Sequence, residues 1–112
     1  MSLPRLKPGM TGEELQKITA EARRAGALLK VLSHQTRLLI LCILADGEKT
    51  VGEMETILNI QQAMVSQQLA RLRMERLVST RRNGRLVYYS IANAHVTALV
   101  ASLFGMFQPG EG

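Results

Sequence analysis

A single β-hairpin signal interrupts a chain whose other segments are patterned for helices. Two β-prone runs, residues 78–82 and 85–91, are separated by Asn83-Gly84. This dipeptide readily accepts the positive φ angles of a type I′ turn, so the sequence predicts a tight hairpin there. Any fold for this chain therefore has to place one short hairpin among helices.

Apolar spacing predicts two helices at the start of the pattern. Steps of three and four residues give the first helix one narrow apolar seam between residues 15 and 32. The second helix, which Ser33 can cap, is apolar on every side over residues 38–44, as expected of a buried central helix. Asp46-Gly47 is expected to end it.

Three further helices complete the prediction. Thr50 and Glu53 have capping-box spacing before a short third helix that ends near Asn59. A fourth helix is expected over residues 61–75, and Asn93 can cap a last helix with a second apolar seam. This order gives a mainly α fold with a β-hairpin wing, the layout of a winged helix-turn-helix.

The 112 residues, 46% of them apolar, suffice for one compact core. We expect a flexible arm over residues 1–12, a DNA-binding and dimerisation domain over residues 13–107 and a tail over residues 108–112. The longest apolar run, residues 38–45, is too short for a membrane span, and no signal-like stretch begins the chain. We therefore expect a cytoplasmic protein with no membrane association.

Positive charge is concentrated in one part of the chain. Residues 61–90 hold six arginines and no lysine against Glu75, a surplus equal to the whole net charge of +5. Guanidinium groups stay charged and match phosphate oxygens, so this part is suited to nucleic acid. A solvated basic face is the alternative that charge alone leaves open.

The fourth helix has small and hydrogen-bonding side chains opposite Val65, at about 100° per residue. Four glutamines within eight residues, with no acid, are unusual for an ordinary exposed face. A helix enters a major groove only if its outward side chains are small or end in donors and acceptors. We predict that the DNA-binding residues on this helix are Gln62, Ala63, Ser66, Gln67, Gln68 and Arg71, and that Ser66, Gln67 and their neighbours read bases.

The hairpin tip is predicted to hold the phosphate backbone. Arg81, Arg82 and Arg85 surround Asn83-Gly84, where several cations can approach a backbone or enter a minor groove. Neutralising about three to five phosphates per subunit would make affinity depend strongly on salt.

Catalytic and metal chemistry have no support in the sequence. His34 and His95 have no carboxylate or thiol beside them to complete a metal site, and no nucleophile has a base at a recognisable spacing. We predict no enzyme activity and no cofactor. Cys42, the single cysteine, is either a small buried apolar residue or a reactive thiol that senses an effector.

Three segments together resemble the ArsR family of small dimeric bacterial repressors: residues 32–41 (LSHQTRLLIL), 62–73 (QAMVSQQLARLR) and 84–91 (GRLVYYSI). The resemblance spans about residues 15–107. It implies a homodimer joined through the first and last helices, with recognition helices in successive major grooves of a palindromic operator in double-stranded DNA. It also implies repression that an inducer relieves.

Within this family, the chain is most similar to the persulfide- and redox-sensing subgroup related to BigR and HlyU. That subgroup has a cysteine in the second helix in a context like that of Cys42, which implies reactive sulfur or an oxidant as the effector. Its second cysteine would fall near Gln108 and is absent, so the subgroup's intramolecular sulfur bridge cannot form. Cys42 acting alone, an intermolecular bond, and no sulfur sensing all remain open.

The metal sensors of the family fail to match. Their ligand positions would fall on Asn93, His95, Met106 and Pro109 in the last helix and on Thr50 and Gly52 in the third, so we expect no metal. The Ser-Gln-Ser start of the family's recognition helix is Gln61-Gln62-Ala63 here, which removes the usual cap.

The sequence thus predicts a sequence-specific DNA-binding regulator, a homodimeric repressor released by a small inducer or by thiol modification. The alternative is a winged-helix module that meets an acidic protein or RNA and has no operator. That alternative predicts weak, sequence-independent binding to DNA.

Overall fold

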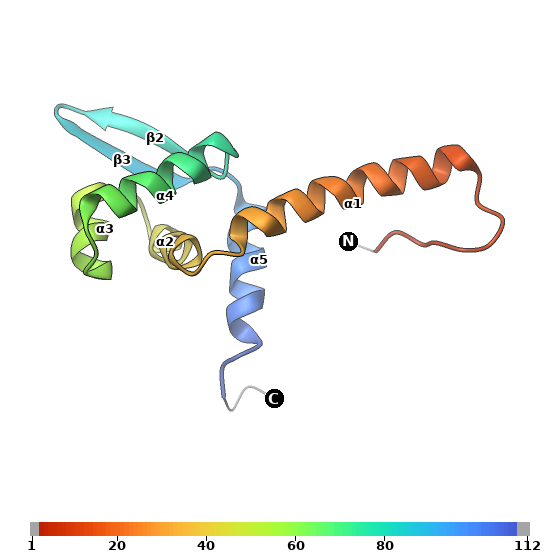
Figure 1. The fold of residues 1–112 in the computed structure, drawn as a ribbon. Coiled ribbons are helices and arrows are strands. Elements are labelled where there is room, and N and C mark those ends of the chain that lie inside the picture. Colours follow the sequence, from red (N-terminus) through yellow and green to blue (C-terminus); the bar gives the residue numbers. More distant parts are fainter. Residues whose placement is uncertain (1–2, 110–112) are drawn as a thin grey trace. The chain divides into compact units, whose positions relative to one another are not determined.

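A computed structural model describes residues 3–109 and contains five helices and three strands in that range (Figure 1). The elements are α1 (Gly12–Leu32), α2 (Gln35–Ala45), β1 (Lys49–Thr50), α3 (Val51–Leu58), α4 (Gln62–Met74), β2 (Val78–Asn83), β3 (Leu86–Ile91) and α5 (Ala94–Gly105). The predicted winged helix-turn-helix, mainly α with a hairpin, is confirmed. The chain divides into two compact units between Lys30 and Val31. The expected limits of arm, domain and tail stay predictions.

The first unit consists of the N-terminal arm and most of α1. Thr11 Oγ1 accepts a 3.1 Å hydrogen bond from the Glu14 backbone N–H, and Glu14 Oε1 accepts one of 3.1 Å from the Thr11 backbone N–H. This capping box, which the sequence analysis missed, lowers the pKa of Glu14. On the predicted apolar seam, Leu15 and Leu29 are 46% and 52% exposed, so this unit does not bury its own seam.

The second unit holds the hydrophobic core. α2 contacts α4, α5 and β3. Its buried residues, Ile40, Leu41 and Leu44, lie on one side, while Leu39 on the other side is 36% exposed. The expectation that α2 is buried all round is therefore wrong for one side of the helix. Among the described residues, the buried apolar side chains are Val31, Leu32, Ile40, Leu41, Leu44, Met54, Val65, Leu69, Leu72, Leu77, Val78, Val96 and Val100.

Local signals at helix ends are mostly confirmed. Thr50 and Glu53 form the predicted capping box of α3, which ends at Asn59 in the left-handed conformation. Asn93 caps α5 by accepting a 2.8 Å hydrogen bond from the His95 backbone N–H. The cap of α2 was predicted incorrectly, because His34 rather than Ser33 occupies the N-cap position. As its sequence suggested, α4 starts without a side-chain cap.

The hairpin belongs to a three-stranded antiparallel sheet in the order β1-β3-β2. β1 has two residues, too few for any alternating pattern, and was not predicted. Asn83 pairs with Leu86, so the two turn residues are Gly84 and Arg85, one position later than expected. Gly84 has φ +65°, whereas neither Asn83 nor Arg85 has a positive φ. A glycine at the first central position fits a type II′ turn, which corrects the predicted type I′.

Among the described residues, no single helix combines the length and the apolar character needed to cross a membrane.

Candidate nucleic-acid interface

α4 presents one polar face to solvent. Val65, Leu69 and Leu72 are buried in the core, and the opposite side exposes Ala63, Gln67 and Ala70. Ser66 and Gln62 are also exposed. The helical phase predicted this arrangement, and the face holds no acid. The assignment of Gln62, Ala63, Ser66 and Gln67 to base reading stays a prediction.

Gln68 differs from the expectation. It is only 8% exposed, and its Oε1 accepts a 2.9 Å hydrogen bond from Nε of Arg37. Nη1 of the same arginine donates a 2.8 Å hydrogen bond to the backbone carbonyl of Val31. Gln68 lies only about 60° from Val65 around the helix, so the phase places it inward. The sequence analysis treated the four glutamines as one group and did not use the helical position of each. Gln68 is therefore not on the solvent face, contrary to the prediction.

Arg71 lies at the edge of the exposed face and is half-buried. Its Nη2 is 3.7 Å from Oε1 of Glu75, one helical turn further along. Its Nε is buried and has no hydrogen-bond partner among the described residues. A surface pair at this spacing contributes little to stability, so Arg71 can still turn toward an anion.

The three hairpin arginines do not share one environment. Arg81 pairs with Tyr88 and Arg82 with Val87, so these neighbours point to opposite faces of the sheet. Arg82 shares its face with buried Val78, and its own side chain is exposed. The structure therefore separates the predicted cluster into one arginine on each face and one in the turn.

The hairpin turn and the start of α4 lie close together. Arg85, in the turn, and Gln62, in the first turn of α4, line one hollow of about 300 Å³. Residues 50–52 at the start of α3 and residues 86–87 of β3 form the rest of its wall. In Figure 1 the hairpin turn lies on the same side of this unit as α3. A cation of the hairpin is thus placed beside the polar face of α4.

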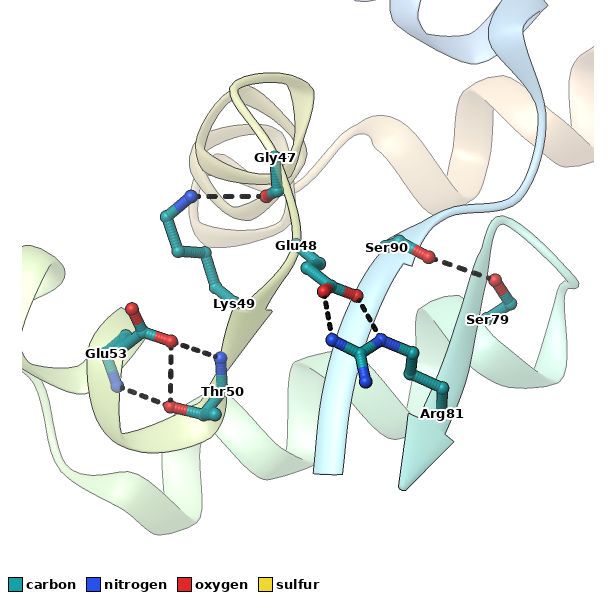
Figure 2. Close-up of polar contacts among 8 residues, drawn as sticks. All are labelled: Gly47, Glu48, Lys49, Thr50, Glu53, Ser79, Arg81 and Ser90. Atoms are coloured by element: carbon teal, nitrogen blue, oxygen red, sulfur yellow. Dashed lines mark hydrogen bonds and ion pairs between the residues drawn. The ribbon is translucent and has the colours of Figure 1, made fainter. Parts of the chain in front are cut away.

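The side chain of Arg81 is exposed and is bound by the carboxylate of Glu48 at the protein surface (Figure 2). Its Nε donates a 2.8 Å hydrogen bond to Oε2 of Glu48, and its Nη2 donates to Oε1 of the same carboxylate. Its guanidinium carbon also lies 4.5 Å from the ring centroid of Tyr88. The hydrogen bond from Arg81 lowers the pKa of Glu48, and the same bond raises the pKa of Arg81. Sequence reasoning missed Glu48, which is 33 positions away in the chain.

Cys42 belongs to α2 and faces a hollow between α2 and α5. It is half-buried and lines an apolar hollow of about 190 Å³, whose other residues include Val100, Ala101 and Phe104 of α5. Burial raises the pKa of its thiol, which favours the protonated form. In the part of the chain that the structure describes, no three His, Cys, Asp or Glu side chains form a group that could hold a metal ion.

The sequence matches the family described as bacterial regulatory protein, arsR family, over residues 34–80. It is 41% identical over 101 residues to the biofilm growth-associated repressor of Xylella fastidiosa (strain 9a5c), covering 90% of this chain and 86% of that protein. It is 37% identical over 93 residues to the transcriptional activator HlyU of Vibrio cholerae, covering 83% and 86% of the two chains.

Solved structures of similar proteins have the same fold. The crystal structure of the transcriptional repressor BigR from Xylella fastidiosa superposes with a TM-score of 0.76 at 40% identity, over 88% of this chain and 98% of that one. Reduced HlyU from Vibrio cholerae also gives a TM-score of 0.76, at 36% identity, over 82% and 97% of the two chains.

Proposed function

Because the chain belongs to the arsR family of bacterial regulatory proteins, and is thus a DNA-binding transcriptional regulator, we propose that it is a homodimeric repressor of a palindromic operator. Operator binding would place it in the cytoplasm. The proposal depends on one observation, which is that the polar face of α4 and the basic hairpin lie next to each other. The acid-free polar face of α4 lies beside a hairpin whose Arg85 lines a hollow together with Gln62.

The two features would divide the work of recognition. Gln67, with Ser66 and Ala63 beside it, would read base edges in the major groove, because amide and hydroxyl groups pair with bases there. Arg82 and Arg85 are exposed, and no salt bridge holds either of them among the described residues. They would bind phosphates, which fix the register of the protein on the duplex.

The homodimer is supported by apolar surface that each unit leaves uncovered. In the first unit, Leu15 and Leu29 of the α1 seam are exposed. In the second unit, Phe104 of α5 is 38% exposed and Phe107 is 81% exposed. A second copy would bury these side chains at about 25 cal/mol per Å² of apolar area. Sedimentation equilibrium tests this directly, and a monomer at micromolar concentration would exclude the dimer.

The effector is proposed to act on Cys42. A reactive sulfur compound or an oxidant that modifies this thiol would add polar bulk to the apolar hollow between α2 and α5. That change would disturb the packing of α5, part of the proposed dimer contact, and weaken operator binding. A Cys42→Ser protein that still leaves DNA after polysulfide or peroxide treatment would remove the thiol from the mechanism.

An anisotropy titration tests the operator proposal. The protein is titrated against the duplex upstream of its own gene and against a scrambled duplex of equal length, at several salt concentrations. A repressor should bind its operator about 10³-fold more tightly or better. Equal affinities would instead support a winged-helix module that meets an acidic protein or RNA.

A further inference from the structure

The guanidinium group of Arg81 contacts two residues, the carboxylate of Glu48 (Figure 2) and the ring of Tyr88. Two of its nitrogens donate to the two carboxylate oxygens of Glu48, and its guanidinium carbon lies over the ring of Tyr88. A bidentate pair of this kind fixes direction as well as distance, because both groups are planar. Arg81 is thus oriented by the protein before any DNA is present.

The pair connects the hairpin to the start of the helix-turn-helix. Glu48 comes directly before β1, whose Thr50 pairs with Tyr88 of β3 and caps α3. Arg81 of β2 pairs with the same Tyr88 from the other side. Glu48, Thr50, Tyr88 and Arg81 therefore lie on one face of the sheet, and the ion pair spans all three strands.

From these contacts we propose that Arg81 is a positioning residue of the DNA interface. Its pair with Glu48 sets the angle of the hairpin relative to α3 and α4, and hence the distance of Arg82 and Arg85 from the base-reading face. This inference rests on the proposed function. It replaces the expectation that Arg81 itself binds phosphate.

The outer part of the hairpin, residues 82–87, needs such a restraint because, among the described residues, no third strand pairs with it. β1 contributes only two residue pairs to β3. Beyond it, β2 and β3 form a two-stranded ribbon, the kind of sheet in which twist varies most. On the same face, the hydroxyls of Ser79 and Ser90 are 3.2 Å apart, nearer the base of the hairpin. The Arg81–Glu48 pair is the charged contact next to the segment that carries Arg82 and the turn.

Arg82 supplies a matched control. It is adjacent to Arg81 and carries the same charge, but it lies on the opposite face of the sheet. The variants Glu48→Gln, Arg81→Gln, their double mutant and Arg82→Gln are compared by operator affinity at several salt concentrations. Loss of one phosphate contact lowers the slope of log affinity against log salt by about 0.9.

For Glu48→Gln, a positioning role and a purely electrostatic effect predict changes in operator affinity of opposite sign. Glu48→Gln removes a negative charge, which by electrostatics alone would tighten DNA binding. We expect it to weaken operator binding about fivefold, as does Arg81→Gln, with the salt slope nearly unchanged. The double mutant should be no weaker than either single variant, and the reversed pair Glu48→Arg with Arg81→Glu should recover most of the affinity. Arg82→Gln alone should lower the slope.

Two results would overturn the inference. One is a Glu48→Gln protein that binds as tightly as the wild type or more tightly. The other is an Arg81→Gln protein that loses as much salt slope as Arg82→Gln. Hydrogen exchange without DNA gives an independent readout, since residues 78–91 should exchange faster in Glu48→Gln than in the wild type. A wild-type protein with no operator preference would contradict the proposed function, while the exchange result would still decide the positioning role.

Discussion

Gln68 accepts a hydrogen bond from Arg37, while its neighbour Gln67 faces solvent. Two adjacent glutamines of α4 thus face in different directions. Gln67 presents its amide to solvent. Gln68 is buried and accepts its hydrogen bond from Arg37, which also donates to the backbone carbonyl of Val31 in the last turn of α1. The orientation of α4 therefore depends on a polar contact as well as on apolar packing.

Replacing Gln68 by leucine should destabilise the protein. The substitution keeps similar volume but removes the acceptor of Arg37 Nε, which is partly buried. An unsatisfied buried donor costs about 1–3 kcal/mol, and more when it is charged. Urea unfolding measures the change. Gln67→Leu is the matched control and should stay within about 0.5 kcal/mol of the wild type, because its side chain is exposed. Equal stability of the two variants would contradict the structural role of Gln68.

Gln67→Ala and Arg82→Ala should affect DNA binding in different ways. Loss of the Gln67 amide should cost about 1–3 kcal/mol on the operator and little on random DNA, because only base contacts carry sequence information. Loss of Arg82 should weaken binding to both duplexes and flatten the salt dependence. Anisotropy with both duplexes distinguishes the two patterns. Identical behaviour of the two variants would show that bases and phosphates are not divided between α4 and the hairpin.

Arg76→Gly should stabilise the end of α4. Arg76 has φ +61°, and its N–H and that of Leu77 donate back to the carbonyls of Arg73 and Leu72, which makes a Schellman motif. A left-handed L-residue costs about 1 kcal/mol, and the greater freedom of glycine in the unfolded chain returns part of it. A net gain of about 0.5 kcal/mol is expected in thermal or urea unfolding.

Gly84→Ala is a control for Arg76→Gly, because it makes the opposite change, from glycine to an L-residue, at a position of positive φ. Gly84 also has a positive φ, and a Cβ there would meet no atom within 4 Å. Any loss of stability would therefore come from the backbone conformation alone, at about 1 kcal/mol. Should both variants shift stability in the same direction, left-handed strain would not be the cause.

Acid should release the hairpin restraint. The pKa of Glu48 is lowered from its ordinary value of 4.5, first by the hydrogen bond from Arg81. A group with a lowered folded-state pKa contributes its stability above the unfolded pKa and loses it as pH falls through the folded pKa. Hydrogen exchange in residues 78–91, corrected for the intrinsic pH effect, should therefore speed up below pH 4.5. The Glu48→Gln protein should lack this transition, and an unchanged transition in that variant would assign it to another carboxylate.

Local signals predicted much of this fold, and contacts between distant segments account for the errors. The caps at Thr50 and Asn93 and the phase of α4 depend on residues within about one helical turn, so the sequence displays them directly. Arg37–Gln68 and Arg81–Glu48 join positions 31 and 33 residues apart, which no local pattern records. The turn was misplaced by one residue because strand register, rather than the Asn-Gly dipeptide alone, selects its central pair.

Cys42 should react slowly with thiol reagents at neutral pH. Burial raises the pKa of the thiol, and the thiolate is the form that attacks, so the folded protein has less of the reactive species. Alkylation with iodoacetamide, followed by intact mass, should be slower in the folded protein than in urea at the same pH. The rate in the folded protein should keep rising above pH 9.0, the ordinary pKa. Equal rates in the two states would show an open, unperturbed thiol. That result would favour direct attack by Cys42 on a sulfur effector, whereas slow reaction would require α2 and α5 to separate first.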